Sequence, residues 1–579
     1  MNLNTDTVKS KCKETYLRLC DSSRCVQNFY DIPFREVLFL ILMFLVMLII
    51  NYLLIALHGF SLSYSKQFPE ISCLSGVFWL LWLSFIGYFA CRRCRWYLFA
   101  LATCHFAVLF ILLAIYFTTG TFFCESILYL VYDTTWEESK GFFSAYVNWK
   151  SILILITILV AYSGSMFFIM KLGRRKKKYC KGDLAASLTM LLIFFFSWVL
   201  WQGDGNFIET IWHEHPFHGI YDHIRTFNKH AGEFIVEMRH RTVPDYVELN
   251  PAFAGKPPIG VLVIGESAIR SHHSIYGYER NTTPSLLARK DEIIAFEDTI
   301  AVLPMTITAL KYWLTDMTLE HRHLSWTIFD VLKKSGYKVD VITNQNKSGW
   351  ADSPLQMIFA TADSVTYMHE ENFSDLAEDR NAQIYDGALL PPFSAWIVKA
   401  QQDVHTPQLA VLHLFGSHEP YGSRFPAEYS HVFMNDTTRT KRVNEYDSSV
   451  WYSDMILGKI LAELEKLDRP AYLIYFSDHG SVCEQSQLRT PGSEENSAYE
   501  IPFLIWTNHH YREQVPELVE RMKLHRQVPL QADRAHFGLL EMMGISFRKD
   551  IGKFNFLSDR YVLPPRFIRE GEAPYRREQ

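Results

Sequence analysis

The sequence predicts two structural parts, an N-terminal bundle of five transmembrane helices and a C-terminal α/β/α sandwich with a largely parallel sheet. Three observations lead to this prediction. Long charge-free apolar runs are confined to the first 202 of the 579 residues. After residue 257, short apolar runs alternate with helix-like segments. The chain is also longer than one compact domain usually is.

Five apolar runs are long enough for a bilayer, whose hydrocarbon core takes about 20 helical residues to cross. They cover approximately residues 37–57, 72–90, 97–117, 151–170 and 185–202. We do not expect a cleavable signal peptide, because the first run begins late and no small-residue cleavage site follows it. The predicted organisation is a transmembrane domain at 1–202, an interfacial linker at 203–250 and an outer domain at 251–579.

Basic residues predict the orientation of these spans, because short cytoplasmic loops collect Lys and Arg. The loops "CRRCRW" and "KLGRRKKKYCKG" and the N-terminal segment are basic, whereas residues 118–150 contain the acidic stretch "YDTTWEESK". We therefore expect a cytoplasmic N-terminus. An odd number of spans then places residues 203–579 on the far side of the membrane.

Charge and cysteine usage narrow the function classes further. The net charge of -5 gives no reason to expect a nucleic-acid partner. Of ten cysteines only Cys483 follows residue 203, so the outer domain holds no internal disulfide. Cys91 and Cys94 form a CxxC in a short basic loop, but no second pair supports a zinc or redox role.

The predicted linker is rich in histidine. His213, His215 and His218 have spacing that metal sites use, but no carboxylate or thiol pattern accompanies them. We favour a connecting segment at the membrane interface, where aromatic residues and amphipathic helices settle.

Five strand candidates follow in the outer domain. Their apolar runs are continuous rather than alternating, as expected for parallel strands covered on both faces. They are "IGVLVIG" (259–265), "YKVDVIT" (337–343), "PQLAVLHLF" (407–415), "PAYLIYFSD" (470–478) and "IPFLIW" (501–506). Helical segments such as "SWTIFDVLKKSG" and "SSVWYSDMILGKILAELEKL" fall between them.

Polar side chains stand at the carboxyl ends of these strands, where ligands of parallel sheets gather. The first candidate ends in Glu266 and Ser267, and a later one in Asp478 and His479. The others end in "TNQ" (343–345) and in a stretch running from His413 to "GSHEP", which contains His418. Carboxylates and imidazoles are ligands that zinc accepts, so we predict a metal site.

A hydroxyl follows a proline at the start of a helix-like run, "LPMTITALKYW". Thr306 there has two interpretations. It caps the helix by bonding free backbone N–H groups, or it is a metal-held nucleophile for a phosphate bound by those groups. Thr308 competes for either role, and the pattern alone leaves the alternatives open.

These residues resemble a known family, the membrane-bound phosphoethanolamine transferases of the alkaline phosphatase and sulfatase superfamily. The matching motifs are "VIGES" with "SIYGYERNTTP", then "LPMTITAL", "LHLFGSHEPY", "NEYDSSVWYSD", and "FSDHG" with "EIPFLIW". Both halves of the chain match, in order and spacing. The lack of extracytoplasmic cysteine pairs resembles the branch acting on core sugars or glucans more than the disulfide-rich lipid A enzymes.

The resemblance implies roles for individual residues. Glu266, Asp478 and His479 would bind Zn²⁺ together with Thr306, the nucleophile. Three residues would bind substrate, of which the last two align less well: His418, Asn344 and Lys347.

One departure from the family concerns a histidine that members often carry about a dozen residues beyond "SDHG". The stretch "SVCEQSQLRTPGSEENSAYEIP" has none, which puts a second zinc or a proton donor in doubt. His272 or His273 could substitute, although surface or packing roles are the favoured interpretation.

The expected activity is transfer of phosphoethanolamine from phosphatidylethanolamine to lipopolysaccharide or a periplasmic glycan, through a phospho-threonine-type intermediate. The implied location is the bacterial inner membrane, with a periplasmic catalytic domain. A glycerol-phosphate transferase and a non-catalytic membrane scaffold are the alternatives. A sulfatase activity is not expected, because the chain lacks its C/S-x-P-x-R motif.

Overall fold

The computed structural model describes scattered residues between 103 and 128, then 149–172, 216–345, 353–368, 384–430, 432–484, 496–568 and 573–575. Four predicted spans lie wholly or largely outside these ranges, and the fifth, 151–170, falls on helix α7 (Trp149–Leu172). Within the described ranges no helix combines the length and apolarity that crossing a membrane requires. The membrane topology therefore stays a prediction.

The chain divides into two compact units, whose boundary in the described part falls between Arg225 and Thr226, inside α10 (Pro216–His240). Helix α7 belongs to the first unit, whereas all the strands and the helices that follow α10 belong to the second unit.

Thirteen strands are described in the second unit, most of them short. They are β1 (Val247–Leu249), β2 (Ile259–Gly265), β3 (Ile293–Ala295), β4 (Thr299–Ile300), β5 (Lys338–Thr343), β6 (Ser364–Tyr367), β7 (Gln408–His413), β8 (Ala471–Ser477), β9 (Phe503–Thr507), β10 (Leu530–Gln531), β11 (Ile545–Phe547), β12 (Phe567–Ile568) and β13 (Ala573–Pro574). The α-helices are α11 (Pro284–Leu287), α12 (Thr306–Trp313), α13 (Ile328–Lys334), α14 (Pro354–Phe359), α16 (Leu390–Gln402), α17 (Lys441–Glu465), α18 (His509–Gln514), α19 (Pro516–Leu524) and α20 (His536–Met542).

Seven strands form the main sheet, in the order β3-β9-β8-β2-β7-β5-β6. Neighbours from β8 to β6 pair in parallel, whereas β9 runs antiparallel to β8 and β3 antiparallel to β9. All five predicted strands are present within a residue or two of their predicted bounds. The sheet is mixed, because the strand formed by "IPFLIW" runs antiparallel to its neighbour β8. The sequence does not reveal this direction, because a buried strand is continuously apolar whichever way it runs.

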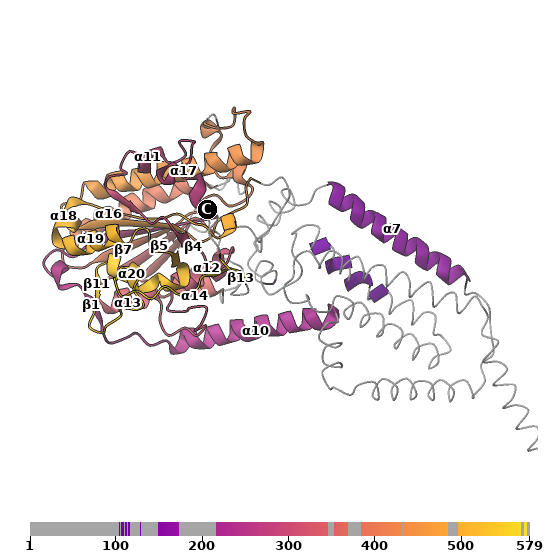
Figure 1. The fold of residues 1–579 in the computed structure, drawn as a ribbon, viewed down its shortest axis with the longest axis horizontal. Helices are drawn as coiled ribbons and strands as arrows, with labels where there is room; N and C mark the ends of the chain where they lie inside the picture. Colours follow the sequence, from indigo (N-terminus) through magenta and orange to yellow (C-terminus); the bar gives the residue numbers. More distant parts are fainter. Residues whose placement is uncertain are drawn as a thin grey trace, which may run out of the picture. The chain divides into compact units, whose positions relative to one another are not determined.

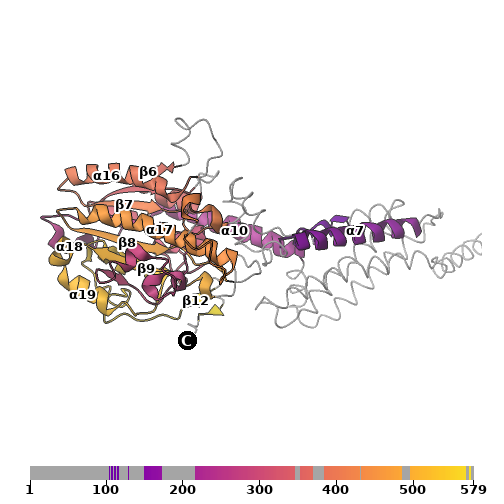
Figure 2. The same cartoon turned by 90° about the horizontal axis from the view of Figure 1, so that it is seen from above.

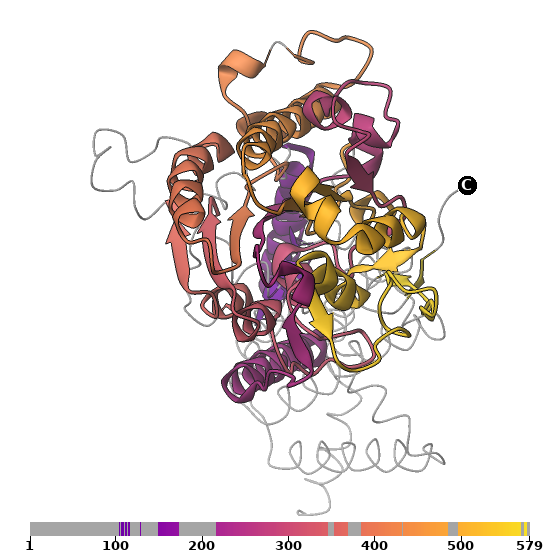
Figure 3. The same cartoon turned by 90° about the vertical axis from the view of Figure 1, so that its left-hand side faces the viewer.

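Helices cover both faces of this sheet (Figure 1, Figure 2, Figure 3). The side chains of β2 alternate between two cores: Val261 and Val263 pack with α11, α16 and α17, whereas Leu262 and Ile264 pack with α12, α13 and α20. This is the predicted α/β/α sandwich. Burial on both faces fixes β2 in the middle of the sheet, and so fixes where its carboxyl end emerges.

Candidate metal centre and nucleophile

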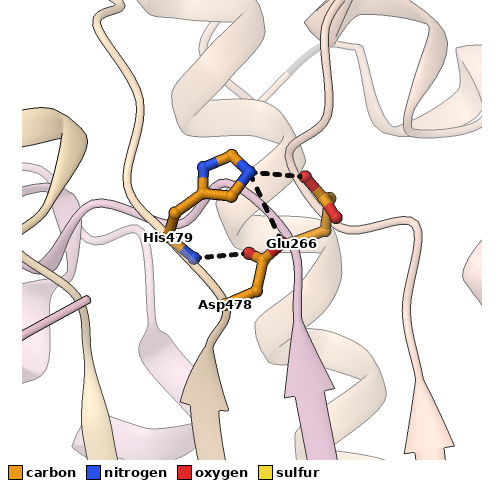
Figure 4. Close-up of side chains that lie close together, drawn as sticks. All are labelled: Glu266, Asp478 and His479. Carbon is orange, nitrogen blue, oxygen red and sulfur yellow. Dashed lines mark hydrogen bonds and ion pairs between the residues drawn. The ribbon is translucent and has the colours of Figure 1, made fainter. Parts of the chain in front are cut away.

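Two adjacent parallel strands place three candidate ligands at one edge of the sheet. Glu266 follows the last residue of β2, and Asp478 and His479 follow the last residue of β8. The register pairs Gly265 with Ser477, so both strands end at the same level and their next side chains converge (Figure 4).

The three side chains form a buried cluster. His479 Nε2 lies 3.4 Å from Glu266 Oε1 and 3.4 Å from Asp478 Oδ2. One ligand atom from each residue lies within 4.8 Å of the others, and this is the one such His, Cys, Asp or Glu cluster among the residues with described positions. The structure thus brings together the three ligands predicted from strand ends.

Thr306 joins this cluster through Glu266. Its Oγ1 donates a hydrogen bond of 2.8 Å to Glu266 Oε2. Thr306 is the first residue of α12, and the preceding Met305, at the N-cap position, makes no side-chain capping bond. Thr308 instead donates to the Met305 carbonyl at 3.1 Å and is 3 % exposed. Of the two hydroxyls, the one that faces the carboxylate cluster is therefore Thr306.

Two further side chains hold the Glu266 carboxylate. Ser267 Oγ donates to Oε1 at 2.8 Å, and Gln345 Nε2 donates to Oε2 at 2.9 Å. Gln345 stands at a predicted strand end, but its position in the sequence predicted no role for it. Its contact depends on β7 standing between β5 and β2, an order that the sequence does not reveal.

Asp478 uses one oxygen for hydrogen bonds to the protein, whereas the other has an ion-pair contact with His479. Its Oδ1 accepts from the backbone N–H of Ser267 at 3.0 Å and of His479 at 2.6 Å. Oδ2 is buried and has no hydrogen-bond partner among the described residues. A buried carboxylate oxygen without a partner is costly, and a metal ion would satisfy it. Two carboxylates and an imidazole that meet at such an atom are a donor set that fits Zn²⁺.

The charges of the cluster are strongly coupled. Burial raises the pKa of Glu266, but the hydrogen bond and charge of His479 outweigh it and hold that pKa well below its usual range. Burial and the negative Glu266 raise the pKa of Asp478. Burial lowers the pKa of His479, but Asp478 and Glu266 outweigh it, so the pKa of the imidazole is raised. Two acids in so small a buried space therefore need a neutralising proton, on Asp478 or on His479, or a bound metal.

The backbone at Ser267 is held in an unusual conformation. Ser267 has a φ of 56°, which non-glycine residues seldom adopt. Tyr446 Oη, from α17, donates to the Ser267 carbonyl at 2.8 Å and accepts from the N–H of Ile269 at 2.7 Å. Gly416, with a φ of 52°, lies so close that a Cβ would stand 2.8 Å from the Glu266 backbone. The turn that aims Glu266 is thus fixed from two sides.

Of the three predicted substrate-binding residues the structure describes two, and neither of these two forms a hydrogen bond with Asp478 or His479. His418 is half-buried, its Nδ1 lies 2.7 Å from the Glu419 carbonyl, and its charge acts on Glu266. Asn344 is fully buried, and its Nδ2 donates to Asp386 Oδ1 at 2.8 Å. Lys347 lies outside the described residues. Substrate binding by these three stays a prediction.

Of the other histidines considered from the sequence, the two whose side chains are described take no part in this cluster. His272 is buried with Nδ1 2.7 Å from Asp447 Oδ1, and the Nδ1 of the buried His273 lies 2.8 Å from the Ile269 carbonyl, which fits the packing interpretation. His213 and His215 lie outside the described residues, and His218 lies on α10, where its side chain is not described.

Comparisons with known proteins found a matching family model and similar sequences. The model of the family described as "Sulfatase" matches residues 258–529. The chain is 25% identical over 432 residues to a phosphoethanolamine transferase EptC of Escherichia coli, covering 68% of this chain and 71% of the relative. It is 26% identical over 296 residues to a Kdo(2)-lipid A phosphoethanolamine 7''-transferase of Salmonella typhimurium, covering 48% and 50% of the two chains.

A solved structure supports the fold. The integral membrane protein EptA of Neisseria meningitidis, a lipooligosaccharide phosphoethanolamine transferase, superposes with a TM-score of 0.58 at 18% identity. The match covers 90% of this chain and 96% of that chain. At this identity the likeness concerns the fold alone.

Proposed function

Because residues 258–529 of this chain match the model of the family described as "Sulfatase", we propose that the protein is a zinc-dependent phosphoethanolamine transferase of the alkaline phosphatase superfamily. The proposed donor is phosphatidylethanolamine, and the proposed acceptor is lipopolysaccharide or a periplasmic glycan. The relatives named as phosphoethanolamine transferases support the transferred group. One observation carries the proposal, the hydrogen bond from the Thr306 hydroxyl to Glu266 inside a cluster of metal-type ligands.

The first step is nucleophilic attack by Thr306 Oγ1 on the phosphorus of the donor. An Oγ1–P bond forms and the bond from phosphorus to the glycerol oxygen breaks, so that diacylglycerol leaves and takes up a proton. The N–H groups at the start of α12 carry no side-chain cap and are available to the phosphoryl oxygens. Glu266 orients the hydroxyl that attacks.

The second step regenerates Thr306. An acceptor oxygen attacks the phosphorus of the phosphoethanolamine-threonine, the Oγ1–P bond breaks, and the Thr306 oxygen returns to the hydrogen-bonding reach of Glu266 Oε2. A covalent intermediate divides one difficult displacement into two easier ones.

Glu266, Asp478, His479 and Thr306 are the residues that would hold Zn²⁺. Bound there, the ion would lower the pKa of the threonine hydroxyl and neutralise charge on the phosphoryl group. Ser267 and Gln345 would keep the Glu266 carboxylate in its orientation.

The location follows from the same proposal. The basic loops support a periplasmic catalytic unit and a cytoplasmic N-terminus. A lipid donor presents its headgroup at the membrane surface, where a membrane-tethered enzyme meets it.

Lipid analysis tests the donor. The purified full-length protein is incubated with vesicles containing phosphatidylethanolamine or phosphatidylglycerol, and the extracted lipids are analysed for diacylglycerol. We expect diacylglycerol from phosphatidylethanolamine, and none with Thr306→Ala or after chelation of the metal. Release from phosphatidylglycerol alone would contradict the proposal and favour the glycerol-phosphate alternative.

A further inference from the structure

A second polar pocket lies apart from the metal centre. Its volume is about 220 Å³, and none of the four residues proposed to hold zinc lines it. Three segments form it: the connection from α12 to α13, the turn that follows β10, and the segment leading into β12. The first segment contributes Glu320 and Arg322, and the second contributes Asp533 and Arg534. The third contributes Phe567 together with Pro564 and Pro565.

Two side chains of this pocket hold polar atoms without hydrogen-bond partners. The Asp533 side chain is 3% exposed; its Oδ2 accepts from the Leu319 N–H at 3.0 Å, whereas Oδ1 has no partner within the described ranges. Arg534 Nε is buried and also lacks a hydrogen-bond partner there, lying 3.7 Å from Asp533 Oδ2. Buried polar groups in native proteins are nearly always bonded, so both atoms call for a partner that the described protein groups do not supply.

The kind of missing ligand follows from the two atoms. Asp533 Oδ1 accepts a hydrogen bond, and Arg534 Nε donates one. A phosphate alone only accepts and would leave Asp533 unpaired, whereas an ammonium group alone only donates and would leave Arg534 unpaired. A zwitterion that carries both groups is the competing ligand, which displacement of the sugar by phosphoethanolamine would reveal. A hydroxyl group does both. Neighbouring hydroxyl groups on one molecule would satisfy both side chains together.

The remaining surface of the pocket agrees with a sugar ring. Two acids, Glu320 and Asp533, balance two arginines, Arg322 and Arg534, so the lining favours a neutral ligand. Pro564, Pro565 and Phe567 supply apolar surface for the C–H face of a ring. The volume lies below the range of roughly 300–1,000 Å³ typical of drug-sized ligands, which suits one ring.

The pocket can also open without unfolding. Arg534 Nη2 is 2.6 Å from Glu320 Oε2, and the Glu320 side chain is 60% exposed. The arginine can therefore exchange this carboxylate for a ligand when Glu320 turns outward.

The chain links this pocket to the nucleophile over a limited distance. Gln531, which also lines the pocket, pairs with Ile300 in the β10–β4 ladder. Thr306 is the sixth residue after Ile300, and an extended chain of six steps spans at most about 20 Å. An acceptor of several sugar units could occupy both places at once.

We propose that the pocket formed by Asp533, Arg534 and Phe567 binds a neutral sugar ring of the glycan acceptor. That the sugar belongs to the acceptor rests on the proposed transferase function. That the ligand is a sugar rests on the pocket itself.

Ligand-observed NMR tests the sugar. The full-length protein is placed in lipid nanodiscs, since glycoside detergents would compete, with millimolar methyl glycosides of glucose, galactose, mannose and a heptose. We expect saturation transfer to the ring C–H protons of at least one glycoside. Phe567→Ala should remove it, and Asp533→Asn should weaken it several-fold because the amide loses the charge-assisted bond. Phe554→Ala is the matched control, since Phe554 is 58% exposed and outside the pocket.

Several results would overturn the assignment. They are absence of transfer to every glycoside, equal transfer in Phe567→Ala and Phe554→Ala, loss of transfer on chelation of the metal, and displacement of the sugar by phosphoethanolamine. Thermal unfolding of each variant in the same nanodiscs separates loss of binding from loss of fold.

Kinetics test the acceptor role separately from the proposed chemistry. Phe567→Ala should raise the KM for the glycan acceptor about tenfold and leave the rate of modification of Thr306 by donor unchanged. An unchanged acceptor KM would overturn the acceptor role. Failure of the proposed function would look different: no modification of Thr306 in any variant, with sugar binding still dependent on Phe567.

Discussion

Gln345 shows how a single side chain holds the Glu266 carboxylate of the candidate metal centre. It donates to the same Glu266 oxygen as Thr306 does, at 2.9 Å, and also to the Leu414 carbonyl at 3.2 Å. It therefore ties the carboxylate to the end of β7. A hydrogen bond to a charged group contributes about 1.5–3 kcal/mol. Its loss should therefore weaken metal binding by Glu266 and the positioning of the Thr306 hydroxyl.

Replacing Gln345 with Ala should slow phosphoethanolamine transfer roughly 10- to 100-fold, the rate equivalent of that hydrogen bond. The measurement is the transfer rate at saturating donor, with zinc content determined on the same samples. Gln408→Ala is the matched control, because Gln408 bonds the Ala400 carbonyl at the opposite end of the sheet. Equal rates for the two variants would refute a positioning role for Gln345.

At the scale of elements, helix α17 acts as a brace for the turn after β2. Tyr446 Oη bonds both the Ser267 carbonyl and the Ile269 N–H, and Ser267 is the residue with positive φ. Such a conformation persists only where surrounding contacts impose it. The helix thereby fixes the direction in which Glu266 leaves the sheet.

Tyr446→Phe should weaken zinc retention and lower the free energy of unfolding by about 1–3 kcal/mol, because two buried backbone groups lose their partner. Competition with a chelator and thermal unfolding report the two effects. Tyr452→Phe, on the same helix, removes a hydroxyl that accepts a hydrogen bond of 3.2 Å from the Gly387 N–H and does not bond to Ser267. If both variants released zinc alike, the brace would have no specific role.

For the whole molecule, buried histidines set the response to acid. Burial lowers the pKa of His273 to about 4 and of His536 to about 3. In the unfolded chain these histidines take up protons as the pH falls below about 6.5. In the folded chain they stay neutral until the pH approaches their lowered pKa values. Stability is therefore fully present above about pH 6.5 and falls as the pH drops toward those folded-state values.

His536→Phe should reduce the loss of unfolding free energy that occurs as the pH falls. Each such histidine costs about 1.4 kcal/mol per pH unit below its unfolded pKa, so between pH 7 and 5 the variant should lose about 2 kcal/mol less than the wild type. The aromatic surroundings of His536, Trp326 and Phe537, suit a phenyl ring. The check is unfolding of the full-length protein at both pH values; parallel losses in variant and wild type would contradict the expectation.

Much of the fold was predictable because the buried strands are apolar throughout and end abruptly in polar residues. That pattern located β2 and β8, and with them Glu266, Asp478 and His479. The direction of β9 was not predictable, since its side chains are buried whichever way it runs. The short strands β3 and β6 carry too few residues to show a pattern.

Contacts that depend on strand order were also beyond the sequence. Gln345 reaches Glu266 only because β7 separates β5 from β2, and Tyr446 reaches Ser267 from a helix 179 residues away in sequence. The choice between Thr306 and Thr308 needed the helix phase, which turns one hydroxyl to Glu266 and the other to the Met305 carbonyl.

The central claim is that Thr306 carries the transferred group, and the intact mass of the protein tests it most directly. Wild type, Thr306→Ala and Thr308→Ala are each incubated with phosphatidylethanolamine vesicles and weighed by mass spectrometry. We predict one added phosphoethanolamine group on wild type and on Thr308→Ala, and none on Thr306→Ala. Addition to Thr306→Ala, or a zinc-loaded wild type that stays unmodified while it consumes donor, would contradict the account.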